Sequence, residues 1–291
     1  PVYMFSVRVK GVSRPFDGIA HRNGDSIFLE LEPGDSEREH SAPELYRLVQ
    51  RSISRFQQAT SVLEICQTCV RQIRRITGFD RVMAYRFDED WNGQVIAEEK
   101  RDDLEPFLGL HYPASDIPQQ ARALYTKNWL RFIADRDYVA VPIIPEVHAA
   151  TDKPLDMSYA VLRSVSPIHL EYLRNMGVGA SMSVSLMRDG KLWGLIACHH
   201  YSPRFVPYDV RTASEMLGHW MSMSLIAAED REQREFREAA REKIATIVAN
   251  VQQTQDIPTS LIDQEPNLLA LLPADGAAIL VGDQVRRIGQ T

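Results

Sequence analysis

The chain is poor in cysteine: Cys66, Cys69 and Cys198 are the only three among 291 residues. An odd and sparse count excludes the disulfide framework of a small secreted protein. No apolar run is long enough for a transmembrane helix, and the sequence shows no signal-peptide pattern. We therefore expect a cytoplasmic protein with no membrane partner.

Positive charge is also scarce, because 33 Lys and Arg residues are outweighed by 39 Asp and Glu residues, for a formal net charge of −6. Without a basic run, the electrostatic footprint of a nucleic-acid-binding protein is missing. The sequence also lacks a nucleotide-binding glycine loop, a metal-ligand cluster and a kinase or cyclase motif. We expect a chain without catalytic activity, without a metal site and without a nucleic-acid partner.

Cys66 and Cys69 form a Cys-x-x-Cys pair within an amphipathic helical pattern. A redox motif or half of a zinc site would need a helix N-terminus, an activating cation or a second pair of ligands. The sequence offers none of these, so we interpret both residues as buried apolar cysteines.

Length and a hydrophobic content of 44% predict more than one core. Alternation from Pro1 to Lys10, and a second run from Ser26 to Glu32 after Asn23-Gly24, predict a small antiparallel sheet. Two helices should follow, each opened by a Ser-x-x-Glu capping box. These boxes pair Ser41 with Glu44 and Ser61 with Glu64, before helices over Leu45 to Phe56 and Ile65 to Thr77, the latter ended by Gly78.

The remainder of the chain mixes strand and helix patterns, which predicts an α+β fold with a sheet backed by helices. The predicted strands lie near residues 79–87, 93–99, 129–134, 158–165, 179–188 and 191–199, and a helix covers Gln119 to Lys127. A helix from about Tyr208 to Gln255 would span roughly 70 Å and must connect two domains. After Ile257-Pro258 we expect a short helix and a hairpin formed by Ala277 to Val281 and Gln284 to Ile288.

The long helix has an apolar face in its first half, formed by Met216, Trp220, Met223 and Ile226. Residues Glu229 to Glu242 are largely charged instead. A helical spine that forms a homodimer through the apolar face is our hypothesis.

Residues 111–118 read His-Tyr-Pro-Ala-Ser-Asp-Ile-Pro and are the most informative segment. Pro113 and Pro118 hold the backbone extended on either side of Ser115 and Asp116, just before a helix. One interpretation is a corner that presents amide donors and a carboxylate to a ligand. The other is an ordinary junction in which Ser115 or Asp116 caps the helix and nothing binds.

Pro-Ala-Ser-Asp-Ile-Pro resembles the signature of the chromophore-binding GAF domain of bacterial phytochromes. Four further segments are similar to family blocks in the same order: Phe79 to Tyr85, Ala121 to Tyr125, Ser166 to Val178 and Leu192 to His200. The match is strongest from residue 60 to 205. Several long blocks in register are far more specific than one short motif.

The resemblance implies a domain order. It assigns the C-terminal part of a PAS domain, a GAF bilin-binding domain, a helical spine and the beginning of a PHY domain, at residues 1–36, 37–225, 208–256 and 257–291. It also implies a chain truncated at both ends, without the later PHY hairpin and without output domains. In full-length relatives these would be a histidine kinase, or another output, and a response regulator.

The implied ligand is biliverdin, a linear tetrapyrrole with two propionates. The family places arginines at the positions of Arg131 and Arg163, and Ser181 and Ser183 could add hydroxyl donors. Arg163 is also notable by itself, because we place it in an apolar strand from Ala160 to Val165, where an inward guanidinium would need an anion.

Other site residues also follow from the resemblance. His169 would lie beside the pyrrole nitrogens and share a water with the main chain of Asp116, and His199 would bind the D-ring carbonyl. The Ser115-Asp116-Ile117 corner belongs to the same site. Further pocket residues are Tyr85, Tyr112, Tyr172, Met83 and Tyr125. They would leave the D ring free to rotate in a light-driven Z-to-E isomerisation.

Two departures concern attachment of the chromophore. Bacterial relatives tether it through a cysteine upstream of the PAS domain, and plant and cyanobacterial relatives through a GAF cysteine whose position here is Ile168. No cysteine of this chain occupies either place, so we predict a pocket without the thioether. The alternative function is a GAF domain that senses a smaller ligand, such as a cyclic nucleotide, without photochemistry.

Overall fold

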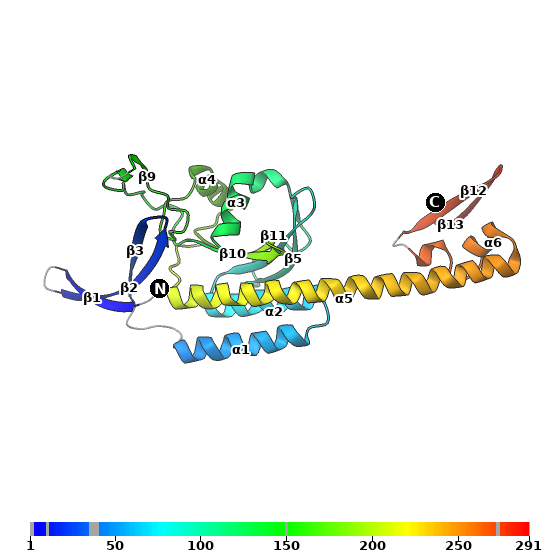
Figure 1. Ribbon diagram of the computed structural model, residues 1–291, viewed down its shortest axis with the longest axis horizontal. Helices are drawn as coiled ribbons and strands as arrows, with labels where there is room; N and C mark the ends of the chain where they lie inside the picture. The colour runs from blue at the N-terminus through cyan, green and yellow to red at the C-terminus, as the bar shows by residue number, and fades with distance from the viewer. Residues whose placement is uncertain (1–2, 10–11, 35–40, 149–150, 272–273, 291) are drawn as a thin grey trace. The chain divides into compact units, whose positions relative to one another are not determined.

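The computed structural model describes residues 3–9, 12–34, 41–148, 151–271 and 274–290, and the chain divides into two compact units, residues 1–226 and 227–291 (Figure 1). The first unit contains a small N-terminal sheet and a larger central sheet with helices on both faces. The second unit contains the end of a long helix, short helices and a hairpin.

The N-terminal sheet has three antiparallel strands in the order β1-β2-β3: β1 (Tyr3–Val9), β2 (Val12–Asn23) and β3 (Ser26–Pro33). The predicted turn at Asn23-Gly24 is confirmed, with Gly24 at a φ of 59° that favours glycine. Parts of the predicted strand from Pro1 to Lys10 lie outside the described residues. The length of β2 was missed because Pro15 within it is unfavourable for an interior strand.

The central sheet has six strands in the order β6-β5-β4-β11-β10-β7, and each neighbouring pair is antiparallel. Its strands are β4 (Arg81–Phe87), β5 (Gly93–Lys100), β6 (His111–Tyr112), β7 (Leu130–Ile133), β10 (Ala180–Arg188) and β11 (Lys191–His200). Two further strands of two residues each, β8 (Val147–His148) and β9 (Lys153–Pro154), pair with each other outside the central sheet. The α+β class expected from the sequence is confirmed.

The predicted strand over 158–165 is wrong. This segment consists of turns, bends and irregular backbone and pairs with no strand, and two of its amides bond to distant side chains. The amide of Leu162 donates to the Glu30 carboxylate at 2.7 Å, and the amide of Val165 donates to the Tyr138 hydroxyl at 2.9 Å. Arg163 therefore lies in an irregular loop.

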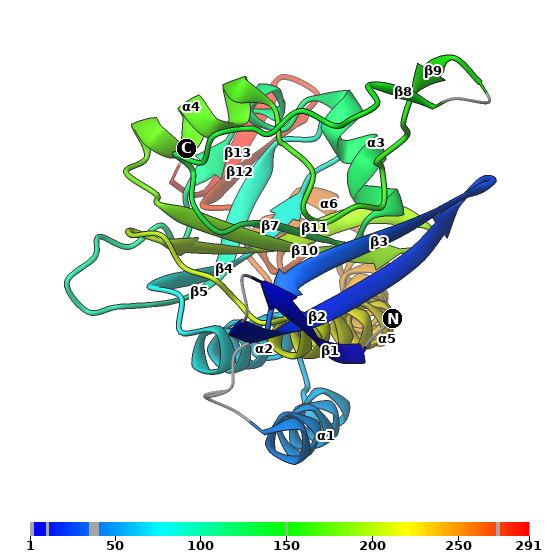
Figure 2. The same cartoon turned by 90° about the vertical axis from the view of Figure 1, so that its left-hand side faces the viewer.

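Helices cover both faces of the central sheet (Figure 2). On one face, α1 (Ala42–Gln58) packs on α2 (Val62–Thr77), which packs on β4 and β5. The opposite face carries α3 (Gln119–Lys127), which contacts β10 and β11, and α4 (Pro167–Asn175). We call the second side the α3/α4 face.

The predicted helix ends are confirmed. α1 begins after Ser41, whose amide donates to the Glu44 carboxylate at 2.8 Å. α2 begins after Ser61, whose hydroxyl accepts from the Glu64 amide at 3.2 Å. α2 ends at Gly78, which has a φ of 64°.

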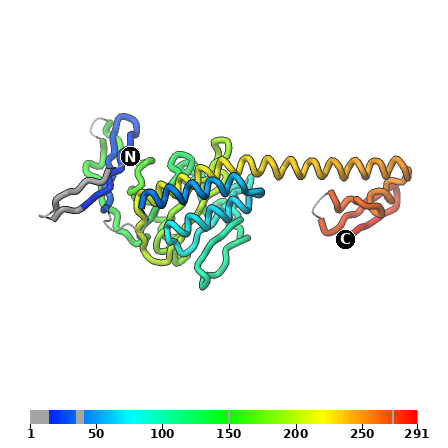
Figure 3. Tube along the Cα trace, turned by 90° about the horizontal axis from the view of Figure 1, so that it is seen from below, coloured from blue at the N-terminus to red at the C-terminus, as the bar shows by residue number. Residues whose placement is uncertain are grey.

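The long helix is α5 (Tyr208–Thr254), a single element of 47 residues that contributes to both units (Figures 1 and 3). In the first unit it packs on the sheet so closely that a Cβ atom on Gly218 would lie 2.5 Å from Cγ1 of Val184 in β10. Two members of its predicted apolar face, Met216 and Met223, are 43% and 63% exposed. This face is therefore not used for packing on the sheet.

The second unit contains the predicted short helix and hairpin. α6 (Ile257–Ile262) and a 3₁₀ turn (Leu268–Ala270) precede β12 (Gly276–Val281) and β13 (Gln284–Gly289). The Lys243 ammonium donates to the Ala270 carbonyl at 2.7 Å, which ties α5 to the 3₁₀ turn. In the described part of the chain, no helix combines the length and apolar character needed to cross a bilayer.

Candidate ligand-binding site

Strand register places the predicted residues of the central sheet on one face. One cross-strand row consists of Arg131, Ser183, Ala197 and Met83, and the next row consists of Ile133, Ser181, His199 and Arg81. Cross-strand partners share a face, and side chains alternate along each strand. Since the intervening Val184 meets α5, these rows point to the opposite, α3/α4 face.

Arg131 is partly buried and surrounded by neutral acceptors. Its guanidinium donates to the Ser183 hydroxyl at 2.8 and 3.1 Å and to the Asn128 carbonyl at 3.1 Å, and it lies 3.9 Å from the centre of the Tyr125 ring. Burial lowers the pKa of Arg131 to about 10. Among the described residues it forms no ion pair with a carboxylate, so an anion would compensate its desolvation.

Arg163 lies near Arg131 although it comes from a loop. Its guanidinium donates to the Ala160 carbonyl at 2.6 Å, and burial lowers its pKa. Its positive charge adds to the effect of burial in lowering the pKa of Arg131. The two like charges therefore interact. Within the described residues neither forms an ion pair with an acid, although the charge of Glu215 raises the pKa of Arg131 and that of Glu30 raises the pKa of Arg163.

Two predicted histidines belong to the same side of the sheet as Arg131: the Arg131 charge acts on His169, and His199 lies in the neighbouring cross-strand row. His169, in α4, stacks on Tyr172 with 6.4 Å between ring centres, and burial followed by the Arg131 charge lowers its pKa. His199, in β11, is buried, and its pKa falls to about 4 through burial, then through the charges of Arg81 and His169. Its Nδ1 atom has no hydrogen-bond partner in the described part of the chain. A buried polar atom of this kind is suited to a ligand.

The predicted tyrosines gather beside Asp116. The Tyr172 hydroxyl donates to the Asp116 carboxylate over a long 3.5 Å, and the rings of Tyr85 and Tyr112 lie 6.0 Å apart. Burial, followed by the Asp116 charge, raises the pKa of Tyr172 to about 12. Burial also raises the pKa of Tyr85 and Tyr112. All three rings are neutral near pH 7 and can form apolar walls.

The segment 111–118 consists of strand β6 followed by a 3₁₀ turn (Ala114–Asp116), and α3 starts after Pro118. Neither Ser115 nor Asp116 caps α3, so this part of the capped-junction interpretation is wrong. Arg122 holds the corner by donating to the carbonyls of Ala114 and Ile117. Ile117 packs on the cluster around Leu195, whereas Ser115 is exposed.

Two polar residues of the site were missed. The Ser185 hydroxyl accepts from Arg131 and donates to the Tyr125 carbonyl at 2.8 Å. Its spacing of two from Ser183 was a usable signal, because it continues the same strand face. Asn128 links Arg131 to the loop at Ser158: its carbonyl accepts from Arg131, and its side-chain amide donates to the Ser158 carbonyl at 3.3 Å. No sequence pattern indicated that Asn128 takes part in the site.

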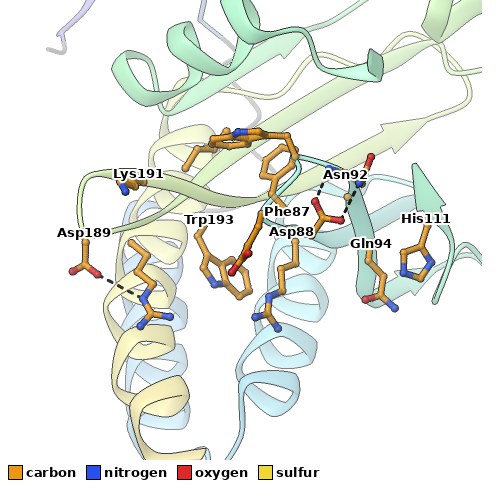
Figure 4. Close-up of a pocket in the computed structure, with 14 residues that line it drawn as sticks. Phe87, Asp88, Asn92, Gln94, His111, Asp189, Lys191 and Trp193 are labelled. Atoms are coloured by element: carbon orange, nitrogen blue, oxygen red, sulfur yellow. Dashed lines mark hydrogen bonds and ion pairs between the residues drawn. The ribbon is translucent and has the colours of Figure 1, made fainter. Parts of the chain in front are cut away.

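A cavity of about 760 Å³ lies elsewhere, at the β4–β5 and β10–β11 turns (Figure 4). Asp88, Asn92, His111, Lys191 and Trp193 are among its lining residues. It shares no residue with the predicted site. Within the described residues, no group of three or more His, Cys, Asp or Glu side chains is arranged to hold a metal ion.

The antiparallel sheet, its flanking helices and the polar residues on its α3/α4 face define a GAF-type sensor domain. The family model of the GAF domain matches residues 61–225, and that of the phytochrome region matches residues 240–291. The chain belongs to the bacterial phytochromes and carries part of their photosensory region.

Similar proteins support this assignment. The chain is 48% identical over 286 residues to cyanobacterial phytochrome B of Nostoc sp., covering 98% of this chain and 38% of that protein. The photosensory core module of Stigmatella aurantiaca phytochrome has a TM-score of 0.76 at 47% identity, covering 99% of this chain and 57% of that one. The chromophore-binding domain of a bacteriophytochrome from R. palustris has a TM-score of 0.76 at 43% identity, covering 79% and 75%. The chain thus spans well under half of the curated relative.

Proposed function

We propose that the chain is a red/far-red light-sensing module that binds biliverdin on the α3/α4 face. One observation carries this proposal: among the described residues neither Arg131 nor Arg163 forms an ion pair with a carboxylate, and Arg131 shares its face of the sheet with the orphaned Nδ1 atom of His199. Biliverdin supplies two propionates and a row of polar pyrrole groups. These requirements match the residues of the face.

Each polar residue of the site recognises a different group of the ligand. Arg131 and Arg163 bind the propionates, because guanidinium groups pair with carboxylates in a bidentate geometry. Ser181 and Ser183 add hydroxyl donors beside them. His169 orients the pyrrole nitrogens, and His199 hydrogen-bonds the carbonyl of the terminal ring.

The apolar and aromatic residues shape the far end of the site. Bound biliverdin supplies a double bond that isomerises from Z to E under light. Tyr85, Tyr112 and Tyr172 provide planar walls with few permanent bonds, together with Met83, Tyr125 and Ile117. Asp116, which Tyr172 contacts weakly, is free to exchange its partner between states, with Ser115 at the exposed edge.

The chain holds the pigment without a thioether. Cys198 alternates with His199 along β11 and therefore points to the α2 side of the sheet, and Cys66 and Cys69 lie in α2. All three thiols are buried, and burial raises the pKa of Cys69 and Cys198. A low thiolate fraction and the wrong side of the sheet both oppose attachment.

Signalling is proposed to pass along α5. We assign the PAS part to residues 1–36 and the GAF domain to residues 37–225. The helical spine is residues 208–256, and the beginning of the PHY domain is residues 257–291. The exposed face around Met216 and Met223 pairs two copies of the chain. The module is proposed to lie in the cytoplasm and to act on an output such as a histidine kinase and its response regulator.

Absorption spectra test the proposal. Biliverdin is added to the purified chain, and spectra from about 500 to 850 nm are taken in darkness and after red illumination. A sharpened red band that moves under light is expected. Absence of bound pigment in this chain and in a version extended at its N-terminus would favour a GAF domain for a smaller ligand.

A further inference from the structure

Strand β3 carries its charged residues inward and its apolar residues outward. Glu30 and Glu32 are buried, at 9% and 2% exposure, whereas Ile27, Leu29 and Leu31 are 78%, 59% and 42% exposed. Burying a carboxylate is costly unless it is paired or hydrogen-bonded. The partners of these two carboxylates therefore indicate which segments β3 holds in place.

Glu32 is paired with the long helix. Both of its oxygens accept from Nη2 of Arg211 in α5, at 2.7 and 2.8 Å, and both side chains are buried. This contact fixes β3 against the beginning of α5 within the first unit. Glu30 lies two residues earlier and so faces the same side as Glu32.

Glu30 reaches the loop that carries Arg163. Its Oε2 atom accepts from the Leu162 amide at 2.7 Å, across 132 positions of sequence. Its charge raises the pKa of Arg163, opposing the larger lowering by burial. Its other oxygen, Oε1, is buried without a hydrogen-bond partner in the described part of the chain and lies 3.6 Å from Nδ1 of His21.

A second contact fixes the start of the same loop. The Asn23 side-chain amide, at the β2–β3 turn, donates to the Asp156 carbonyl at 2.8 Å. The segment from Asp156 to Leu162 is thus attached at both ends to one hairpin of the N-terminal sheet. Since the loop has no strand partner of its own, these bonds replace a sheet ladder.

We propose that Glu30 is a positioning residue for Arg163: through the Leu162 amide it holds the loop so that the guanidinium faces an anionic ligand beside Arg131. The inference rests on the proposed function for the nature of that ligand. It adds a role for the N-terminal sheet, which orients a residue of the site without contacting the ligand itself.

The first test needs no ligand. Amide exchange of peptides covering residues 156–166 is measured by mass spectrometry for the wild type, Glu30→Ala and Glu30→Gln, with the exposed Asp25→Asn as a control. Loss of a hydrogen bond to a charged acceptor should speed exchange at Leu162 about tenfold or more in Glu30→Ala. The glutamine carbonyl can still accept, so Glu30→Gln should stay within about threefold. Unchanged exchange in Glu30→Ala would overturn the proposal.

The second test uses biliverdin and its dimethyl ester, which lacks the propionate charges. Glu30→Ala should weaken biliverdin binding about tenfold and leave the ester within about threefold, because only the acid needs an oriented Arg163. Equal losses for both ligands, or equal losses in Glu30→Ala and Glu30→Gln, would contradict positioning. If Glu30→Ala fails to fold, Glu30→Asp replaces it, since its shorter side chain keeps the charge but loses the reach.

The two tests separate the two proposals. If the wild type binds neither pigment, the proposed function and the ligand part of this inference fail together. Amide exchange then still decides whether Glu30 holds the loop.

Discussion

The ring of Tyr85 lies against the backbone of Gly93 so closely that a Cβ atom at residue 93 would come within 1.7 Å of the Tyr85 Cζ atom. The two residues belong to the paired strands β4 and β5, next to a register shift between Ala84 and Tyr85. Glycine at this position therefore sets the place of one aromatic wall of the site.

Gly93→Ala should displace the Tyr85 ring and destabilise the chain by about 1–3 kcal/mol, because extra volume in a packed site forces side chains off their preferred rotamers. Urea unfolding measures the loss. In a Tyr85→Ala background the same substitution should cost less than about 1 kcal/mol. An equal cost in both backgrounds would show that the ring is not what glycine accommodates.

Arg131→Gln should affect stability and binding in opposite directions. Without ligand, removing a desolvated charge that has no carboxylate partner among the described residues should raise the melting temperature. Biliverdin affinity should fall about tenfold or more, since a charged hydrogen-bond donor is lost. Lys191→Gln, which removes an exposed cation lining the other cavity, is the matched control and should change neither quantity. Unchanged affinity in Arg131→Gln would remove this arginine from the site.

His199 should make ligand-free stability depend on pH. Burial lowers its folded pKa from 6.5 to about 4, so between these values the unfolded chain binds a proton that the folded chain does not. Stability should therefore fall as the pH falls from 6.5 toward 4, by up to about 3 kcal/mol from this residue. His169, whose pKa is also lowered, acts in the same direction.

Urea unfolding of His199→Phe across this pH range tests the effect. The variant should lose stability less steeply than the wild type as the medium becomes more acidic. Parallel curves for wild type and His199→Phe would refute the assignment.

The buried pair of Glu32 and Arg211 should be sensitive to loss of one partner. Glu32→Gln leaves the guanidinium of Arg211 buried without its charge partner and should cost about 3–5 kcal/mol. Replacing both residues by methionine should restore most of this stability, because no uncompensated charge remains. Chemical denaturation of Glu32→Met, Arg211→Met and the double variant measures the coupling between the two residues, and additive losses in the two single variants would exclude it.

Met223→Glu should weaken the proposed dimer, since a charge would enter an apolar interface. Analytical ultracentrifugation should show a shift toward monomer of at least about tenfold in the dissociation constant. Val141→Glu changes another exposed apolar residue, 81% exposed and outside α5, and should leave association unaltered. Equal effects of the two substitutions would exclude a specific role for the α5 face.

Local signals predicted much of the fold correctly. Ser41 and Ser61 start helices because their capping partners lie three residues away, and Gly78 ends α2 because it accepts a positive φ. The strand predicted over 158–165 was wrong because a contact with a distant residue, and not a local pattern, determines the structure of this segment. The acceptor of the Leu162 amide is Glu30, which is 132 residues distant and invisible to any local pattern.

The sequence by itself determined the family, the residues proposed for the site and the positions of the regular helices, because motifs and periods of 3.6 residues are local properties. Only the tertiary structure decided that Arg131 and His199 share a face, that Arg163 lies in a loop and not in a strand, and that β3 turns two carboxylates inward. These facts depend on strand register and on contacts between distant segments. A shift of one residue in register would send every side chain of a strand to the other face.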